Sequence, residues 1–173
     1  MARIRHYVAT SLDGFVATDN GKVDFLDPFH HLDLGYPEFS RQIGTLVMGR
    51  RTYDQVRGFG VWPYAGKNTV VLTKNALDPD PPLGVEAYRG DLADLLPPLR
   101  EAVDGDIWVV GGPLTARAFL DRNALDEVEV LVVPVVLGRG LSLFAGHEVH
   151  RKLELVLAEA KDGGVVRLLY RPQ

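Results

Sequence analysis

Two short stretches combine glycine, hydroxyl and arginine side chains in an order that suits phosphate binding. In the first, the apolar run 46–48 ends at Gly49, and Arg50, Arg51 and Thr52 follow at the start of a helix-like segment. The N–H groups of a helix's first turn and the positive end of its dipole attract anions. Arginine can add bidentate hydrogen bonds to phosphate oxygens. Because the arginines follow a strand and a glycine, we favour a phosphate site here over solvated surface charge.

The same order recurs further along the chain. The apolar run 107–110 is followed by Gly111 and Gly112, and then by Pro113, Leu114 and Thr115, which suit a helix start. The two glycines alone could equally be a tight turn with close packing. Two junctions of strand, glycine and helix in one small chain favour a ligand with several phosphates, and a dinucleotide is the obvious candidate.

Composition limits the remaining chemistry. The chain has 173 residues, 46% of them apolar and 24% charged, which suits a single domain over residues 1–173. It contains no cysteine, which excludes disulfides and thiolate metal sites, and its five histidines show no metal-binding spacing, in 147–150 or elsewhere. A net charge of −4 argues against general nucleic-acid binding. No run has the length of a membrane span or the form of a signal peptide, so we expect a cytoplasmic protein.

Strand-like and helix-like patterns alternate over the first 120 residues. We expect helices at residues 37–43, 50–56, about 92–103 with Asp91 as the cap, and 113–120. We expect strands at residues 4–10, 45–48, 67–73, 85–88 and from 107, and a functional loop at 19–36.

The last third of the sequence changes character. Residues 128–137, 153–159 and 165–170 read as strands without intervening helices, so this part should be antiparallel. The order of elements predicts a mixed sheet with helices on both faces. These long apolar strands would leave an edge or a face in water, which predicts a homodimer.

Five motifs, in this order, resemble the dihydrofolate-reductase-like superfamily, and more closely its branch with the C-terminal reductase domain of bacterial riboflavin-pathway enzymes. They lie at residues 9–14 (ATSLDG), 48–53 (MGRRTY), 71–74 (VLTK), 109–112 (VVGG) and 133–140 (VPVVLGRG). The resemblance implies a three-layer α/β/α fold, with a mixed sheet of about eight strands and an antiparallel C-terminal hairpin. It also implies an NADPH-dependent reductase, and relatives in this branch look dimeric.

The resemblance also implies site residues. Ala9 would meet the nicotinamide carboxamide through its backbone, with Asp13 and Gly14 on the neighbouring loop. Arg50 would meet the 2′-phosphate of the cofactor. We expect no acidic partner beside the cations Arg50, Arg51 and Lys74. The implied cofactor contacts are Ala9, Gly14, Gly49, Arg50, Arg51, Thr52, Leu72, Thr73, Lys74, Gly111, Gly112, Leu114 and Thr115.

Asp13 is the implied catalytic residue, which would supply or orient a proton. Its place before Gly14 also fits a residue that only stabilises its own turn. The implied substrate contacts are Ser11, Trp62, Val135 and Gly138. Packing in the core or in a lid is the alternative for Trp62, and a plain turn is the alternative for residues 135–140.

We therefore expect an NADPH-dependent reductase of a small heterocyclic, carbonyl or imine compound, with 5-amino-6-(5-phosphoribosylamino)uracil reductase-like activity as the specific case. The alternatives are a dihydrofolate reductase and a non-catalytic NADPH-binding protein. Folate reductases carry an acid on the first helix, and the best-matching position here falls near Leu34 or Gly35, with Asp33 and Glu38 on either side. This departure predicts poor activity on dihydrofolate.

Overall fold

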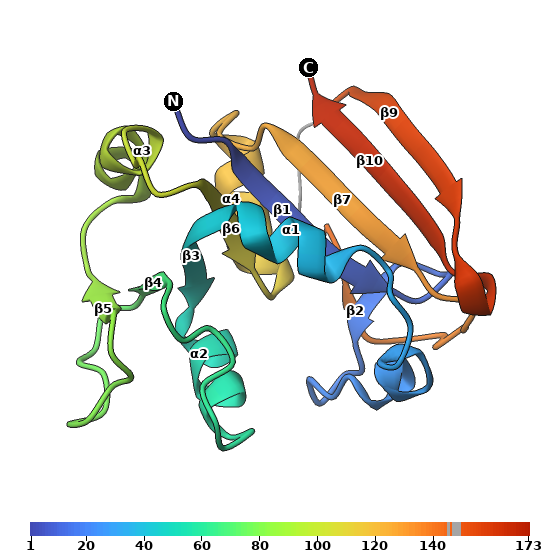
Figure 1. The fold of residues 1–173 in the computed structure, drawn as a ribbon, viewed down its shortest axis with the longest axis horizontal. Coiled ribbons are helices and arrows are strands. Elements are labelled where there is room, and N and C mark those ends of the chain that lie inside the picture. The colour runs from blue at the N-terminus through green and yellow to red at the C-terminus, as the bar shows by residue number, and fades with distance from the viewer. Residues whose placement is uncertain (145, 147–149) are drawn as a thin grey trace.

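The computed structural model describes residues 1–144, 146 and 150–173 (Figure 1), so 147–149 of the histidine-containing stretch lie outside it. The helices are α1 (Tyr36–Gln42), α2 (Arg50–Arg57), α3 (Leu92–Arg100) and α4 (Pro113–Asp121), with 3-10 turns η1 (Asp24–Phe29) and η2 (Asp162–Gly164). The strands are β1 (Ile4–Thr10), β2 (Phe15–Ala17), β3 (Ile43–Gly49), β4 (Asn68–Leu72), β5 (Val85–Tyr88), β6 (Asp106–Val110), β7 (Glu127–Val132), β8 (Leu141–Ser142), β9 (Leu153–Ala160) and β10 (Val166–Pro172).

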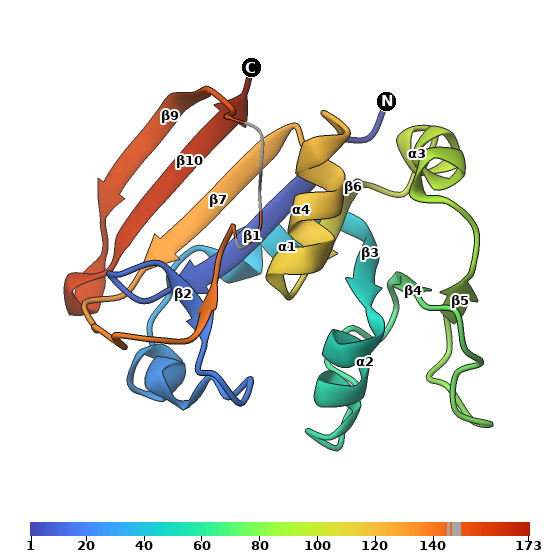
Figure 2. The same ribbon diagram turned by 180° about the vertical axis from the view of Figure 1, so that it is seen from behind.

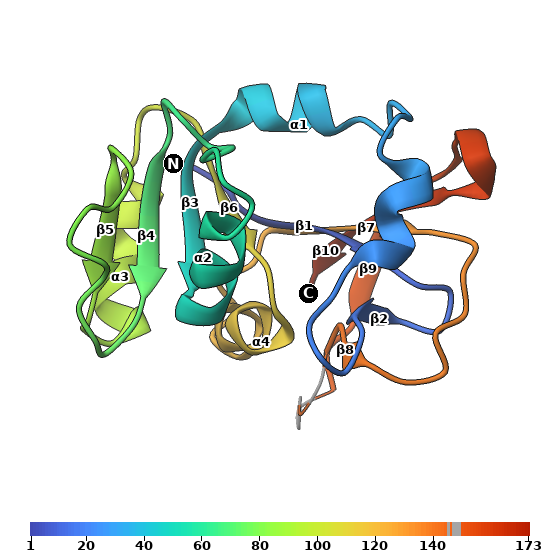
Figure 3. The same ribbon diagram turned by 90° about the horizontal axis from the view of Figure 1, so that it is seen from below.

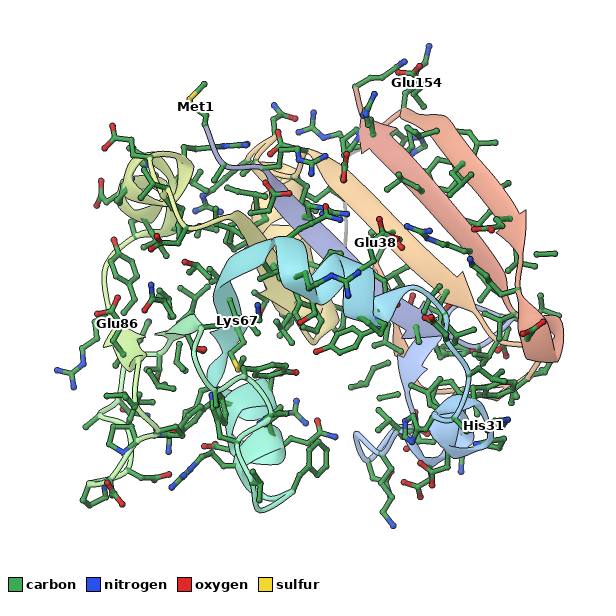
Figure 4. The ribbon with its side chains drawn as sticks, in the orientation of Figure 1. Met1, His31, Glu38, Lys67, Glu86 and Glu154 are labelled. Atoms are coloured by element: carbon green, nitrogen blue, oxygen red, sulfur yellow. The ribbon has the colours of Figure 1, made fainter. Side chains whose placement is uncertain are left out.

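Eight strands form the central sheet in the order β5-β4-β3-β6-β1-β7-β10-β9. The strands from β5 to β7 are parallel, and β10 is antiparallel to both β7 and β9. The labelled Glu86 on β5 and Glu154 on β9 mark the two opposite edges (Figure 4). The predicted mixed sheet with a C-terminal antiparallel hairpin is confirmed.

Helices cover both faces of the sheet, as predicted. Side chains of α3 and α4, such as Leu95 and Phe119, share one buried cluster with Ile4 and Val47. On the other face, Phe39 of α1 and Tyr53 of α2 pack with strand side chains such as Leu46. Figure 3, seen from below, shows α1 and α4 on opposite sides of the strands. Among the described residues, no helix is long and apolar enough to cross a membrane.

The C-terminal hairpin extends beyond the helices. In the two opposite views of Figures 1 and 2, no described helix lies over β9 or β10. Val166 is paired in register with Val132 of β7 and Ala160 of β9, so these three side chains share one face. Val166 is 38% exposed and Val156 is 40% exposed. One apolar face of the hairpin is therefore open to solvent in the single chain.

Several predicted boundaries are wrong. The strand expected at 128–137 ends at Val132, because Pro134 has no N–H group for a ladder. The helix expected to reach Val103 ends at Arg100, although Asp91 caps it as predicted, by accepting from the Ala93 N–H group. The expected loop 19–36 contains the 3-10 turn η1, and the turn at residues 12–15 leads into β2, which pairs with β8.

Candidate functional site

The carboxyl ends of the parallel strands meet at one edge of the sheet, where the candidate site lies. In Figure 1 the arrowheads of β1, β3 and β7 all point towards the lower edge. Helices α2 and α4 begin at this edge, directly after β3 and β6, which are neighbours in the sheet. In open α/β sheets, ligands bind outside the carboxyl ends of the strands. The fold thus brings both predicted phosphate junctions to a place suited to a ligand.

The two junctions pack against each other in a reciprocal way. The side chain of Thr52 on α2 occupies the space that a Cβ atom on Gly111 would need, and Gly111 has a φ of +92°. On the other side, Thr115 Oγ1 lies 3.0 Å from the position of a Cβ atom on Gly49. Neither α2 nor α4 has a side-chain cap on its first N–H groups. Both helix starts therefore keep backbone donors for an anion.

Arg50 is already paired with acids, contrary to our expectation. Its Nε lies 2.8 Å from Asp54 Oδ1 and its Nη2 lies 3.7 Å from Asp78 Oδ1. It also donates to the Ala76 carbonyl oxygen at 2.7 Å. The side chain of Arg50 is 31% exposed, so the acids orient it without enclosing it. It can still reach a phosphate, with part of its charge neutralised.

A pocket of about 420 Å³ opens beside Arg50, between the ends of β4 and β5 and the start of α3. Leu72, Thr73 and Lys74, which we assigned to the cofactor from the sequence, line it, whereas Arg51 is exposed on α2 and does not. Arg89 adds a third cation that we did not predict. The other lining residues missed from the sequence are Asn75, Tyr88, Gly90 and Leu92. Arg89 and its neighbours could have been predicted from their position after the strand at residues 85–88, because residues that follow adjacent parallel strands lie together.

Asp13 joins two loops at the same edge. Its carboxylate accepts from the N–H groups of Leu137 at 3.1 Å and Gly138 at 2.7 Å. The Ser11 hydroxyl and these backbone groups lower the pKa of Asp13 to about 2. A carboxyl group with such a pKa carries no proton at neutral pH, so it is unsuited to donate one. The geometry favours a structural role for Asp13 that extends beyond its own turn, in which Asp13 orients the distant loop that holds Gly138.

The predicted substrate contacts divide into two groups. Ser11 is buried and its Oγ accepts from the Phe15 N–H group at 3.0 Å, which gives it a role in the turn. Val135 is half-buried and accepts a hydrogen bond from the Leu12 N–H group at 2.7 Å, so it lies beside Asp13 and Gly138. Trp62 packs against the same buried cluster as Val135, with its ring 5.8 Å from Tyr53 and 5.4 Å from Tyr64. Its surroundings fit the packing alternative.

An aromatic cluster beneath α1 was not predicted. Tyr7 of β1 stacks on Phe39 with ring centroids 4.4 Å apart, and Trp108 contacts both rings edge-on. Tyr36 lies 6.1 Å from Tyr7 at the start of α1. Tyr7, Trp108 and the α1 pair of Tyr36 and Phe39 are far apart in sequence, so only the pairing of β1 with β6 and the position of α1 bring them together.

No acid of α1 extends under the helix where a folate reductase would need one. The Asp33 side chain accepts from the Gly35 N–H group at 3.0 Å, and Glu38 is exposed on the outside of α1 (Figure 4). At Gly35 the nearest side-chain atom is Arg167 Nη1, 3.7 Å from where a Cβ atom would lie. A cation therefore stands near the position that we matched to the acid.

Comparisons with known proteins show the family and the fold to which the chain belongs. The chain is 34% identical over 167 residues to the uncharacterized protein YwjB of Bacillus subtilis, covering 95% of this chain and 94% of that protein. A putative riboflavin biosynthesis protein from Shewanella has a crystal structure with a TM-score of 0.86 and 30% identity, covering 100% of this chain and 99% of that one.

A second structure shares the fold at lower identity. It is a diaminohydroxyphosphoribosylaminopyrimidine deaminase/5-amino-6-(5-phosphoribosylamino)uracil reductase from Thermotoga maritima, with a TM-score of 0.76 and 19% identity, and the match covers 99% of this chain and 57% of that one. The model of the RibD C-terminal domain, a reductase family, matches residues 61–167. The chain belongs to the RibD C-terminal domain family.

Proposed function

We propose that the protein is an NADPH-dependent reductase of a small heterocyclic, carbonyl or imine compound. The pocket of about 420 Å³ next to the start of α2 carries this proposal, because Arg50, Lys74 and Arg89 line it. A phosphate on a ribose needs cations, whereas a free 2′-hydroxyl is usually met by a carboxylate. Asp54 and Asp78 form ion pairs with Arg50. Lys74 and Arg89 have no ion-pair partner among the described residues, so their charge is available to a phosphate.

The residues present fit the remaining parts of this cofactor. The uncapped starts of α2 and α4 would hold the pyrophosphate, with Thr52 and Thr115 as hydroxyl donors. The backbone of Ala9 at the end of β1 would meet the nicotinamide, beside Gly14 and Leu114. Bound NADPH would supply the reducing equivalent, while the protein positions the acceptor and excludes water.

The specific substrate that we propose is an aminopyrimidine of the 5-amino-6-(5-phosphoribosylamino)uracil type. Membership of the RibD C-terminal domain family and the fold shared with the Thermotoga reductase support it. Arg167 near Gly35, where folate reductases carry an acid of the first helix, departs from the folate reductase pattern and so supports a pyrimidine over a folate substrate.

We also propose a homodimer formed through the open face of the C-terminal hairpin. The exposed side chains of Leu155, Val156 and Val166 support it, since a monomer would leave them in water. The partner that covers this face would be a second copy of the chain.

Isothermal titration with NADPH and NADH tests the cofactor assignment. We expect NADPH to bind at least tenfold more tightly than NADH. Arg89→Ala should reduce that preference, whereas Lys152→Ala, which removes an exposed cation from the start of β9, should not. Equal affinity for both cofactors would refute the assignment. Binding of NADPH without turnover of any pyrimidine, pterin or carbonyl compound would instead favour a non-catalytic nucleotide-binding protein.

A further inference from the structure

Besides Arg5 Nε, which lies 2.9 Å from Glu127, two neighbouring buried polar atoms on the face beneath α1 have no hydrogen-bond partner among the described residues. One is the hydroxyl oxygen of Tyr7, a residue that is 8% exposed, and the other is Oε2 of Glu129, which is 2% exposed. Tyr7 and Glu129 are paired in register on the neighbouring strands β1 and β7, so their side chains share one face. Buried polar groups are nearly always hydrogen-bonded, so two neighbouring exceptions indicate that a partner binds here.

Arg167 of β10 lies next to Glu129 and is the third residue of this group, after Tyr7 and Glu129. Its Nε donates to Glu129 Oε1 at 2.6 Å, while its Nη1 lies 3.8 Å from Glu159, beyond hydrogen-bonding distance. The side chain of Arg167 is 22% exposed, and Nη1 lies against Gly35 at the start of α1. The guanidinium group therefore keeps donors for a ligand that approaches from its solvent-exposed side.

The surroundings favour a neutral and planar ligand. Glu129 Oε2 lies 3.7 Å from Arg5 Nη2, beyond hydrogen-bonding distance, and each carboxylate of this face has a cationic neighbour. Glu129 pairs with Arg5 and Arg167, Glu127 and Asp106 pair with Arg3 and Arg5, and Glu159 pairs with Arg167 and Lys161. The rings of Tyr36, Phe39 and Trp108 contact the ring of Tyr7. Flat apolar walls with a few polar atoms are typical of sites for ring compounds.

We propose that Tyr7, Glu129 and Arg167 form a subsite that binds the cyclic amide edge of a planar heterocycle. An N–H group of the ring would donate to Glu129 Oε2, the adjacent carbonyl oxygen would accept from Arg167, and the Tyr7 hydroxyl would bond either group. Burial and the Glu129 charge raise the pKa of Tyr7, so its O–H group stays protonated.

The subsite lies next to the proposed cofactor site, and its assignment to the substrate rests on the proposed function. Tyr7 and Ala9 are two residues apart on β1, so their side chains point to the same face about 7 Å apart. A heterocycle held at Tyr7 would therefore lie beside a ring held at Ala9. This placement assigns recognition of the acceptor to β1, β7 and β10, and recognition of the cofactor to the end of β1, the starts of α2 and α4 and the pocket at the ends of β4 and β5.

The test uses 6-aminouracil and its 1,3-dimethyl analogue, which has the same ring without its ring N–H groups. Binding to the full chain is followed by saturation-transfer NMR, with and without NADPH. We expect 6-aminouracil to bind at least tenfold more tightly than the analogue. Glu129→Gln should weaken 6-aminouracil about tenfold or more, the scale of a hydrogen bond to a charged group. Tyr7→Phe should weaken it about threefold to tenfold.

Glu127→Gln is the matched control, because Glu127 is equally buried on β7 but both its oxygens are paired, with Arg3 and Arg5. It should lower stability without changing the affinity for 6-aminouracil. NADPH affinity should stay within twofold in all three variants. If 6-aminouracil fails to bind, or if Glu127→Gln weakens it as much as Glu129→Gln, the subsite is overturned. If the subsite is overturned but NADPH binds normally, the reductase proposal still stands. If the unaltered protein does not bind NADPH, the reductase proposal is refuted.

Discussion

Thr52 on α2 fills the space beside Gly111 at the end of β6, where any side chain would collide with it. Gly111→Ala should therefore destabilise the protein by about 2–4 kcal/mol, through the overlap and through the positive φ of this residue. Gly112→Ala is the control, because nothing lies within 4 Å of its Cβ position. We expect that change to cost less than about 1 kcal/mol, as at other helix caps. Urea denaturation of both variants measures the difference, and similar losses would contradict the packing argument.

Arg50→Ala should weaken NADPH binding by about 1.5–3 kcal/mol, the scale of a hydrogen bond between charged groups. NADH affinity should change much less, because NADH has no 2′-phosphate. Asp54→Asn is the informative partner, since it removes the carboxylate 2.8 Å from Arg50 and keeps the arginine. Calorimetry should show NADPH affinity unchanged or higher in Asp54→Asn. A loss equal to that of Arg50→Ala would mean that the ion pair, and not the free cation, matters.

Asp13 should stay ionised down to a pH near 2, because the Ser11 hydroxyl and the loop N–H groups lower its pKa. The stability that it contributes should be complete above the unfolded pKa of about 4 and should be lost as the pH falls towards 2. In an NMR titration, its carboxyl carbon should show no midpoint above pH 3. With a substrate, Asp13→Asn should lower turnover through the loop geometry and leave the pH dependence of turnover unchanged. A midpoint near pH 4 would contradict the lowered pKa, and only a midpoint above about pH 6 would restore Asp13 as a possible acid.

His6 should make the protein sensitive to mild acid. Burial lowers the pKa of its ring, which bonds the Val109 carbonyl oxygen through Nδ1 at 2.9 Å. Above pH 6.5 the ring is neutral in both states. As the pH falls below 6.5, the unfolded state takes up the proton first, so stability falls by up to about 1.4 kcal/mol per pH unit.

The variant His6→Asn keeps a donor near Nδ1 and removes the titration. Chemical denaturation from pH 7 to pH 5 should show the unaltered protein losing stability relative to this variant. Parallel curves for the two proteins would show that His6 does not titrate on unfolding in this range.

Val166→Glu should disrupt the proposed dimer. Val166 lies between Val132 and Ala160 on the open face of the hairpin, and a charge there would be buried in an interface. Light scattering should give a dimer mass for the unaltered protein and a monomer mass for the variant. Lys152→Glu, an exposed change at the start of β9, should leave the mass unaltered. A monomer mass for the unaltered protein at micromolar concentration would refute the proposal.

The sequence predicts those parts of the site that depend on local order. The run of strand, glycine and helix around Gly49 and Gly111 is contiguous, so its pattern sufficed to place both helix starts. The pairing of Arg50 with Asp54 could also have been read from its spacing of four residues in a helix. Its contact with Asp78 could not, because it depends on the loop after β4 returning to α2.

Features that depend on the register between distant strands were not predicted from the sequence. Arg89 joins the pocket only because β5 pairs with β4, and Tyr7 meets Glu129 and Arg167 only through the order β1-β7-β10. The strand expected up to Leu137 was predicted too long, because the apolar pattern continues past Pro134, which ends the ladder of hydrogen bonds. Periodicity describes burial, and it does not say which strands will be neighbours.

The loops after β1 and β7 are tied together at four points, through Asp13 to Leu137 and Gly138, through Leu12 to Val135, and through Gly14 to Leu143. Neither loop can therefore change shape alone. An insertion in one of them would require a compensating change in the other, although more than 120 residues separate them in the chain. During divergence of such reductases, the two segments should evolve as a correlated pair, with substrate preference changing through both at once.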